Sequence, residues 1–405
     1  MKMTNNNMKR IVYLSVILAL TALNGAAQNI CGSWAGTLDV EESKLPLVFH
    51  IAPDGQCTFD SPKEMVRNIP AEIVYLSPDS IFLTTAVNFT YAGRLQDGVI
   101  HGTFSQNGMT FPMDLVLMKR PQTPQPPFPY QTQEVKFNNP KAGATFAGTL
   151  TLPEGASTVL LMVTGSGSQN RDEEIMSHKP FAVIADKLAR QGIATLRYDD
   201  RGYGESVGGE VINATTQDFA EDAKAGIEWL RQSGLFRQVG ILGHSEGGGI
   251  AFMLGAQGLV DFIVSLAGPA VQGDTLLLEQ NKLIAGDRAQ YLTIEVLRRN
   301  PRIQQSPWYS FFMDYNPQDD IAKITCPVMA VHGEKDCQVS CEMCLNALRQ
   351  VLPANEHSLI KSYPGLNHLF QHCETGLPDE YELIEETISV EVINDIITWI
   401  KSLND

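Results

Sequence analysis

The chain lacks a hydrophobic run long enough to cross a membrane comfortably. The apolar stretch IVYLSVILALTAL at residues 11–23 is shorter than the roughly 20 residues that a spanning helix needs. Basic residues are scarce as well, because 30 Lys and Arg stand against 46 Asp and Glu, for a formal net charge of −16. Such an acidic surface argues against nucleic acid and against anionic membranes as partners.

The patterns of common metal and nucleotide sites are also missing. Cys337, Cys341 and Cys344 form C-x3-C-x2-C, but a zinc site needs a second ligand pair at suitable spacing, and none is evident. The glycine-rich segment TGSGS at 164–168 is not followed by the Lys-Ser/Thr pair of a phosphate-binding loop, and neither nucleotide fingerprint has its spacing. We therefore expect no metal and no cofactor.

What is present indicates an exported globular protein. Hydrophobic residues make up 43% and charged residues 19% of the chain, which permits a sizeable core. A basic start, an apolar stretch and small residues at Gly25 and Ala27 predict a secretory signal at residues 1–27, cleaved after Ala27. Cleavage removes three basic residues and no acidic one, which changes the formal charge from −16 to −19.

The cysteines are compatible with export, but the sequence does not define a disulfide pairing. Seven cysteines leave at least one thiol unpaired, and disulfides are possible in an oxidising compartment. An alternative lipoprotein signal, with Cys31 as the acylated residue, is disfavoured because Asn29 and Ile30 stand where small residues would be expected.

Residues 28–119 predict a small all-β domain, either a barrel or a sandwich. Short alternating apolar segments are separated by the turn clusters PDG, SPDS, QDG and QNG, which is hairpin spacing. The opening GSWAG at 32–36 resembles the start of lipocalin-like barrels. No cluster of nucleophile, base or ligand residues is apparent there, so we expect an accessory role. The prolines of residues 120–134 then predict an extended linker.

Residues 135–405 follow a different pattern, in which strand-like and helical segments alternate. Continuous apolar runs such as TVLLMV at 158–163 and QVGILGH at 238–244 are typical of buried parallel strands covered by helices on both faces. The interval 270–321 is mostly helical in pattern between two core strands. It predicts a cap over the carboxyl edge of the sheet, where ligands of such sheets bind.

The segment GHSEG at 243–247 has the G-x-S-x-G pattern of a nucleophile elbow, a tight strand-to-helix turn that exposes a serine hydroxyl. An ordinary glycine-rich turn is the alternative, but the elbow lies between a buried-type strand and a plausible helix. On this architecture the partners follow in the order Ser, acid, His, each after a strand. Ser245 is therefore the predicted nucleophile, because a base and its orienting acid follow it.

Asp336 and His368 occupy those two positions. Asp336 lies in the loop after the apolar strand VMAVHG, and its rival Glu334 lies closer to the strand end. His368 follows the next strand, where Gly365 and Asn367 suggest a flexible loop, whereas its rival His372 lies in a segment, HLFQHC, that resembles a helix beginning.

Hydrolysis also needs donors aimed at the oxyanion. The backbone N–H of Glu246 follows the nucleophile, and the second donor is predicted at Ser166 or Gly167, in the loop after an early strand. The charged segments QNRDEE and RYDDRGYGES suggest an ion-paired network that braces the site. Its expected members are Arg171, Asp172, Asp200 and Arg201, with direct contact to substrate as the alternative.

Taken together, GSGSQNRDE, RYDDRGYGES, GHSEGG and GLNHLF make residues 130–405 resemble the α/β-hydrolase superfamily, near its secreted bacterial esterases and serine aminopeptidase-like hydrolases. The resemblance implies a triad of Ser245, His368 and Asp336 and a covalent acyl-enzyme that water resolves. It also implies a periplasmic or secreted bacterial protein. The sequence departs from the common His-Gly oxyanion segment, because Thr164 stands at the histidine's place.

Three functions follow from this sequence. The first is an exported esterase that cleaves a small or medium acyl ester, on a small molecule or on a glycan. The second is an aminopeptidase-like enzyme of the same fold. The third is an inactive hydrolase domain whose β domain binds a glycan or a cell surface; we disfavour it because the catalytic constellation is complete.

Overall fold

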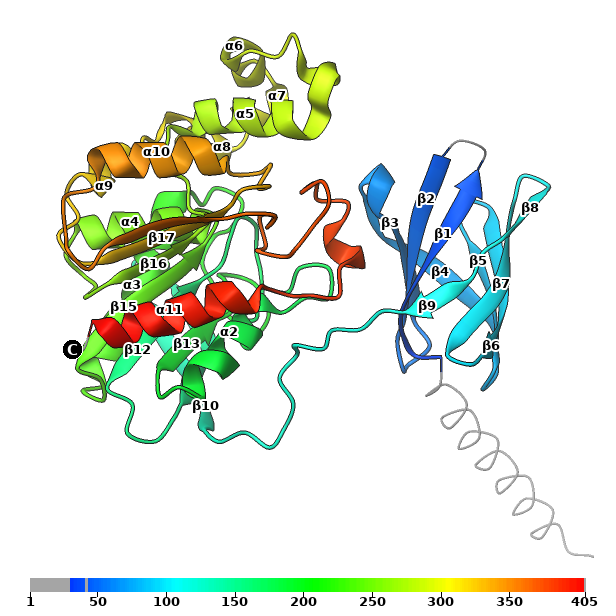
Figure 1. Ribbon diagram of the computed structural model, residues 1–405, viewed down its shortest axis with the longest axis horizontal. Helices are drawn as coiled ribbons and strands as arrows, with labels where there is room; N and C mark the ends of the chain where they lie inside the picture. Colours follow the sequence, from blue (N-terminus) through cyan, green and yellow to red (C-terminus); the bar gives the residue numbers. More distant parts are fainter. Residues whose placement is uncertain (1–29, 41–42, 404–405) are drawn as a thin grey trace, which may run out of the picture. The chain divides into compact units, whose positions relative to one another are not determined.

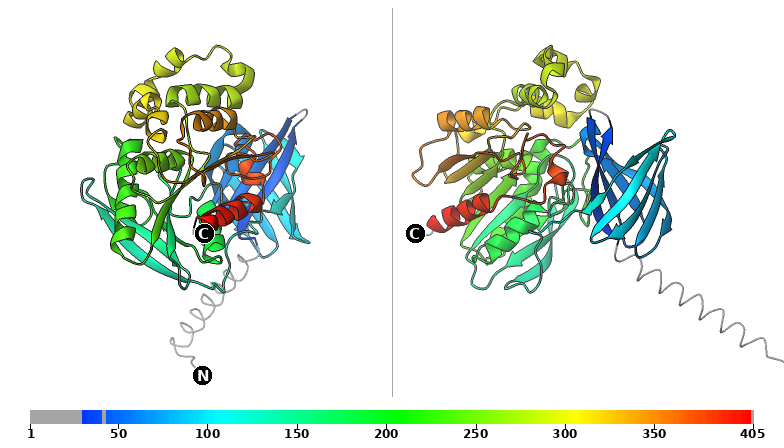
Figure 2. Two further views of the ribbon diagram at one scale, coloured as in Figure 1. Left: turned by 60° about the vertical axis from the view of Figure 1, so that its left-hand side comes forward. Right: turned by 45° about the vertical axis from the view of Figure 1, so that its right-hand side comes forward.

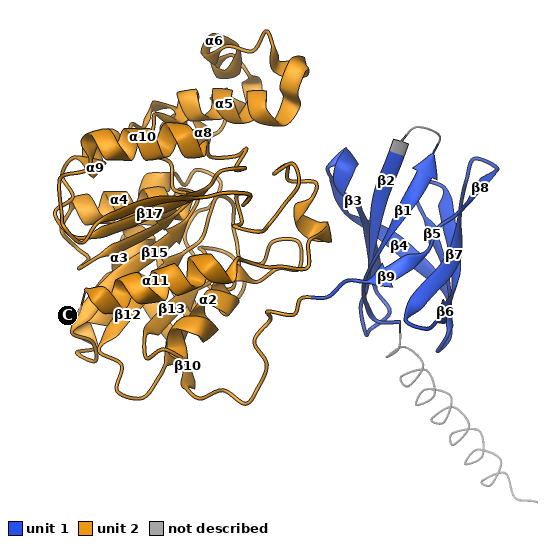
Figure 3. Ribbon diagram, viewed as in Figure 1, with its two compact units in different colours: residues 1–119 blue, residues 120–405 orange. Residues whose placement is uncertain are grey.

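The computed structural model describes residues 30–40 and 43–403 (Figure 1). The predicted secretory signal, residues 1–27, lies outside these described residues. The chain divides into two compact units, residues 1–119 and 120–405 (Figure 3).

The first unit is a closed antiparallel barrel. Its strands are β1 (Gly32–Val40), β2 (Ser43–Ile51), β3 (Cys57–Ser61), β4 (Val66–Leu76), β5 (Ser80–Thr85), β6 (Phe89–Gln96), β7 (Val99–Gln106), β8 (Met109–Pro112) and β9 (Leu115–Leu117), with a 3-10 helix η1 (Pro62–Glu64) after β3. Successive strands pair from β1 to β7, β7 also pairs with β9, and β9 pairs with β1. The ring is thereby closed, and β8 lies outside it as a hairpin partner of β7. Of the two predicted architectures, the barrel is confirmed.

Large side chains fill the barrel. The buried cluster includes six aromatic rings: Trp34, Phe49, Phe59, Phe89, Tyr91 and Phe104. The polar atoms of the two amphipathic rings are satisfied inside: the Trp34 indole donates to the Ile30 carbonyl at 2.8 Å, and the Tyr91 hydroxyl lies 3.1 Å from the Ile100 carbonyl oxygen. An eight-stranded barrel either is filled by side chains or holds one small ligand, and the aromatic rings fill this one.

The second unit is built on a mixed sheet. Its strands are β10 (Gln131–Asn139), β11 (Ala144–Leu152), β12 (Thr158–Val163), β13 (Ala194–Tyr198), β14 (Val207–Gly208), β15 (Gln238–His244), β16 (Ile263–Leu266), β17 (Val328–Gly333) and β18 (Leu359–Tyr363). Their order is β10-β11-β13-β12-β15-β16-β17-β18, with β14 paired to β11. From β13 to β18 every pairing is parallel, so the carboxyl ends of these strands share one edge.

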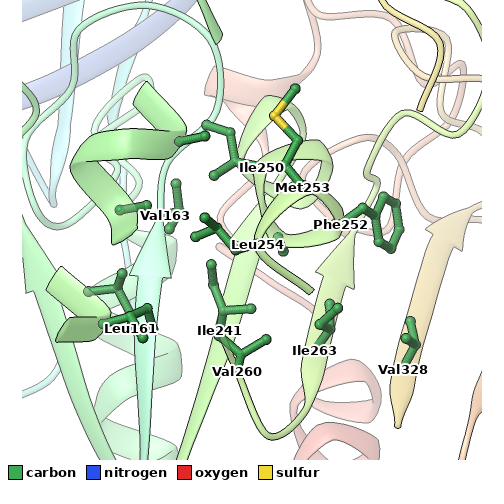
Figure 4. Close-up of a cluster of buried hydrophobic side chains, with 14 of the residues drawn as sticks. Leu161, Val163, Ile241, Ile250, Phe252, Met253, Leu254, Val260, Ile263 and Val328 are labelled. Carbon is green, nitrogen blue, oxygen red and sulfur yellow. The ribbon is translucent and has the colours of Figure 1, made fainter. Parts of the chain in front are cut away.

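Helices cover both faces of this sheet (Figures 1 and 2). They are α2 (Pro180–Ala189), α3 (Thr216–Gln232), α4 (Glu246–Ala256), α10 (Cys341–Val351) and α11 (Val390–Ser402). In β12, Leu161 and Val163 pack in the cluster that contains residues of α3, α4 and α10 (Figure 4), whereas Leu160 and Met162 pack in the cluster with α2 and α11. Alternate side chains of a strand thus pack against the helices on opposite faces of the sheet, as the continuous apolar runs predict.

The predicted cap is confirmed as a set of short helices between β16 and β17. They are α5 (Gly273–Ala285), η2 (Gly286–Ala289), α6 (Ile294–Arg298), α7 (Pro301–Gln304), α8 (Pro307–Asp314) and α9 (Gln318–Ile321). Arg298 of α6 joins the ends of two longer cap helices, because it pairs with Asp274 at 2.8 Å and with Asp314 at 2.7 Å.

The linker is shorter and more firmly attached than the sequence suggested. Strand β10 begins at Gln131 rather than after residue 134, and its first residues are polar and exposed at the sheet edge, so they carry no apolar signal. Arg120 donates to the carbonyl groups of Glu382 and Ile384, in and next to a short 3-10 helix, η3 (Tyr381–Leu383). The start of the linker therefore belongs structurally to the second unit.

His178 fastens the loop before α2 to the same C-terminal segment. Its side chain is fully buried, and its ring nitrogens lie 2.9 Å from the Tyr381 carbonyl oxygen and 3.1 Å from the Thr387 hydroxyl. A neutral ring satisfies both contacts, since a hydroxyl can donate. Burial, together with the charge of Arg120, lowers the pKa of His178 to about 4.

We predict that His178 makes the protein less stable in mild acid. The unfolded histidine has a pKa of about 6.5, so between roughly pH 6.5 and 4 the unfolded chain binds a proton that the folded chain does not. Stability therefore falls with falling pH, by about 2 kcal/mol for this residue at pH 5. Urea unfolding of full-length protein at pH 7.5 and 5 should show a smaller loss in His178→Gln than in wild type. His357→Gln, at an exposed histidine, is the control and should keep the wild-type loss; equal losses in all three proteins would contradict the prediction.

Candidate active site

Ser245 lies in the sharp turn between β15 and α4. Its backbone has φ 54° and ψ −120°, a left-handed conformation that is costly for a residue with a side chain. The turn is held on both sides, because the Ser245 N–H donates to the Leu266 carbonyl at 2.8 Å and its own carbonyl accepts from the Gly248 N–H at 2.9 Å. Every other residue from 241 to 250 is buried, whereas Ser245 is partly exposed.

The glycines around Ser245 allow backbones to approach one another. A Cβ on Gly243 would lie 2.0 Å from the Gly247 carbonyl oxygen, and one on Gly247 would lie 2.1 Å from the Val163 carbonyl oxygen. The start of α4 is therefore pressed against the end of β12. These close approaches explain why both outer positions of the G-x-S-x-G pattern, 243 and 247, are glycines.

Asp336 and His368 meet at the carboxyl ends of the next strands. The His368 Nδ1 lies 2.7 Å from Asp336 Oδ2, and the other carboxylate oxygen accepts from the backbone N–H groups of Gln338 and Val339, each at 2.8 Å. Burial alone would raise the pKa of Asp336, but the His368 ring and these donors hold it below its ordinary value. The carboxylate is thus kept charged beside the imidazole.

Neither rival occupies this position. Glu334 is exposed and accepts from the Ser362 hydroxyl, while the His372 side chain is 67% exposed and pairs with Glu386. The segment after His368 forms a turn and an isolated bridge, not the expected helix beginning. The loop is also more constrained than expected, because Asn367 is fully buried and accepts from the N–H groups of Leu369 and Gln371.

Ser245 and His368 both line one cavity of about 320 Å³. Of the two candidates for the second oxyanion donor, Ser166 lines this cavity, whereas Gly167 lines a separate cavity of about 30 Å³. The chain turns at Gly167, where φ is +92°, and this turn carries that residue away from Ser245. Glu246, the first residue of α4, offers the other predicted N–H, because the first amides of a helix have no intrahelical acceptor.

The predicted oxyanion loop, residues 164–169, is held by the carboxyl groups of Asp200 and Glu173. Asp200 accepts from the Thr164 hydroxyl at 2.9 Å and from the Gln169 N–H at 2.8 Å. Glu173, which is 1% exposed, accepts from the Gly165 N–H at 2.9 Å. The Gly165 amide is therefore occupied, and Ser166 is the next residue whose N–H is available.

The remaining charged residues form separate pairs rather than one network. Arg171 pairs with Asp199 at 2.8 Å and also contacts Glu134 and Glu205. Asp172 pairs with Arg197. Arg201 and Asp222 are both buried and lie 2.6 Å apart. By contrast, the two donors to Asp200 described above, the Thr164 hydroxyl and the Gln169 N–H, are both neutral. None of these four predicted residues lines the large cavity, which favours the bracing role over contact with substrate.

Glu246 connects the elbow to the cap, a role that the sequence did not reveal. Its carboxylate is buried and accepts from the Thr216 hydroxyl at 2.6 Å and from the Trp308 indole of α8 at 2.7 Å. Burial raises its pKa. Trp308, Tyr309 and Phe312 of the same helix line the cavity, so this hydrogen bond anchors the cap helix that forms one wall.

The other cavity walls are mostly apolar. The lining includes Ile175, Met176, Pro269, Leu276, Leu277, Val339, Leu369 and Pro378. Its two carboxylates, Glu173 and Glu246, are both buried and already accept hydrogen bonds. The cavity therefore suits an uncharged organic group.

The cysteines add no further group to this site. Cys57, Cys326, Cys337, Cys341, Cys344 and Cys373 form no disulfide in the structure, and burial raises the pKa of Cys341 to about 11. Within the described residues, Cys337, Cys341 and Cys344 do not meet as a group of metal ligands. None of the helices in that part of the chain is long and apolar enough to span a bilayer.

The sheet order, the strained serine at the end of β15 and the paired Asp336 and His368 define the α/β-hydrolase class of fold. A family model described as serine aminopeptidase, S33, matches residues 176–304. Esterase EstD of Thermotoga maritima is 28% identical over 268 residues, which cover 62% of this chain and 64% of the esterase, less than two thirds of its length. A monoacylglycerol lipase of Mycolicibacterium smegmatis is 26% identical over 246 residues, or 54% of this chain and 82% of the lipase.

Among solved structures, an esterase of Pyrococcus furiosus, Pf2001, aligns with a TM-score of 0.46 and 16% identity, over 67% of this chain and 90% of that one. The family model and the sequence relatives agree with the resemblance found in the motifs. The fold is that of the α/β hydrolases, and the sequence is similar to the serine aminopeptidase-like family over residues 176–304 and to an esterase.

We predict that two neighbouring glycines of α4 respond oppositely to alanine. Gly247→Ala places a methyl group against the Val163 carbonyl and should destabilise the protein by about 1–3 kcal/mol. Gly249→Ala is the matched control, because its Cβ would meet Pro269 at 3.5 Å, an ordinary contact; it should be neutral or stabilise by up to about 1 kcal/mol. Urea unfolding of both variants measures the difference, and similar values would mean that the elbow is not as tightly packed as described.

Proposed function

We propose that the protein is an exported serine hydrolase that cleaves carboxylic esters carrying an uncharged acyl or alcohol group. The observation that carries the proposal is that Ser245 and His368 line one cavity, while the buried Asp336 pairs with His368 Nδ1 at 2.7 Å. The similarity to an esterase and to a monoacylglycerol lipase supports it.

In the proposed mechanism the His368 Nε2 takes the Ser245 hydroxyl proton as the oxygen attacks the ester carbonyl. Asp336 fixes the ring through Nδ1 and stabilises the imidazolium that forms. The backbone N–H groups of Glu246 and Ser166 receive the developing oxyanion. His368 then protonates the leaving alcohol, and water resolves the acyl-enzyme by the same steps in reverse roles.

An aminopeptidase is the second candidate, and the name of the matching family model favours it. Recognition of a free N-terminal ammonium requires a carboxylate exposed to the substrate. Both carboxylates in the cavity wall are buried and engaged with protein donors. We therefore place ester cleavage first.

The barrel is proposed as an accessory domain. Because its interior is filled by aromatic side chains, a ligand held inside it is disfavoured, and any binding to a glycan would use its outer surface. An ester on a glycan and an ester of a small molecule both remain candidate substrates. Export rests on the predicted signal at residues 1–27.

We predict that a fluorophosphonate probe labels wild-type protein and fails to label Ser245→Ala. The probe reacts with activated serines, so labelling reports the nucleophile independently of the natural substrate. A panel of aryl esters set beside aminoacyl-arylamides should then show turnover of esters. Preferred cleavage of the arylamides would favour the aminopeptidase, and a folded wild-type protein that neither labels nor turns over substrate would contradict the hydrolase proposal.

We further predict that ester cleavage depends on Asp336 and His368 and not on their rivals Glu334 and His372. Asp336→Ala and His368→Ala should lower kcat for the best ester by about 10⁴-fold, because the imidazole or its orienting charge is lost. Glu334→Ala and His372→Ala, which alter the exposed rivals, should stay within about threefold of wild type. A large loss of kcat in Glu334→Ala with a mild loss in Asp336→Ala would make Glu334 the orienting acid. The same outcome for His372→Ala and His368→Ala would make His372 the base.

A further inference from the structure

His244 is a buried histidine whose two ring nitrogens both face acceptors. Nδ1 lies 2.8 Å from Glu173 Oε1, and Nε2 lies 3.0 Å from the backbone carbonyl oxygen of His368. The His244 and Glu173 side chains are 6% and 1% exposed. A carbonyl oxygen has no proton to give, so Nε2 must donate to it.

The proton on Nδ1 follows from the surroundings of Glu173. The same carboxylate oxygen that faces His244 also accepts from the Gly165 N–H at 2.9 Å. The Gly165 N–H donor on this oxygen favours the charged carboxylate, and a charged carboxylate facing His244 requires a donor at Nδ1. The contacts are therefore satisfied together when His244 is an imidazolium and Glu173 a carboxylate.

This pair touches every segment that the proposed reaction needs. His244 immediately precedes Ser245 in the chain, Nε2 holds the backbone of His368, and Glu173 holds Gly165, next to the proposed donor Ser166. The His244 and His368 rings also lie against each other, with centroids 4.7 Å apart. One buried ion pair thus connects the nucleophile, the base and the oxyanion loop.

We propose that His244 is a positioning residue that Glu173 keeps protonated, and that this ion pair sets the oxyanion loop and the His368 backbone in register with Ser245. The proposal rests on the proposed function, because it names what aligns that site. His244 does not transfer a proton in the reaction; it acts through the three segments that it joins.

The charges around the pair determine its pH dependence. Burial disfavours the imidazolium, but the charge and hydrogen bond of Glu173, with Asp336 beyond His368, raise the pKa of His244 above its ordinary value. The other titratable groups nearby are His368 itself, Asp200 on the loop after β13, and Glu246 on α4. Without the charge of Glu173, burial would dominate and hold the pKa of His244 below its ordinary value, so the ring would be neutral at pH 8 and protonated again only in mild acid.

The test compares Glu173→Gln with wild type from pH 5 to 8 on the best ester of the panel. Glutamine keeps an oxygen that accepts from Gly165 but removes the charge. We expect kcat to fall by about 10–100-fold at pH 8, with KM changed little, and we expect the variant to recover part of this loss toward pH 5, where His244 is protonated again. The ratio of variant to wild-type kcat/KM should therefore rise about tenfold from pH 8 to 5.

The control is Glu174→Gln, at the neighbouring surface carboxylate that pairs with Lys179, which should behave as wild type at every pH. A large effect that is constant with pH would overturn the proposal, since a merely structural role of Glu173 predicts that result. So would a variant as active as wild type at pH 8.

A second readout needs neither turnover nor a folded Glu173 variant. In wild-type protein labelled with ¹⁵N-histidine, both His244 nitrogens should carry protons at pH 8, as assigned by loss of the two signals in His244→Asn. A single protonated nitrogen would overturn the proposal even if the enzyme is active. If the wild-type protein neither labels with fluorophosphonate nor cleaves esters, the proposed function fails, while this spectrum still decides the charge of His244.

Discussion

The structure of the site depends on one close contact between backbones, where the first turn of α4 presses against the end of β12. Gly247 makes this contact possible, because any side chain there would meet the Val163 carbonyl. The contact leaves no room for a relaxed turn, so Ser245 takes a left-handed conformation that isolated residues avoid. The Ser245 hydroxyl is thereby presented beside the oxyanion loop, which follows β12. The proposed nucleophile and the loop proposed to support the oxyanion are thus held by a single packing constraint.

Much of this arrangement could be predicted from the sequence, because it rests on local patterns. The strand β15 carries an apolar run at 239–243, and α4 is apolar around most of its surface because all but its last residue are buried. Asp336 and His368 each follow such a strand, so the shared carboxyl edge brings them together. The cap was visible as a helical interval between two core strands.

The parts that the sequence did not reveal depend on contacts between distant segments. Glu173 has a positive φ of 52° and is buried by its partners His244 and Gly165, although it stands in a run of charged residues that resembles an exposed loop. Trp308 reaches Glu246 from the cap, and nothing local marks that pairing. Closure of the barrel likewise joins β1 to β9, strands far apart in the chain. The start of β10 was missed because an edge strand needs no apolar residues on its open side.

The attachment of the linker has a consequence for how such a protein is assembled from parts. Gln122 accepts from the Thr387 N–H and donates to the Ile388 carbonyl, and Arg120 binds the same C-terminal stretch. The seam between the two units therefore falls at residues 119 and 120, ahead of the prolines rather than among them. A gene fusion or a protease cut at that seam divides the chain between its two compact units and leaves the proline-rich strap joined to the second. In the design of truncated variants, the proline-rich segment therefore belongs with the second unit, whereas the barrel ends before it.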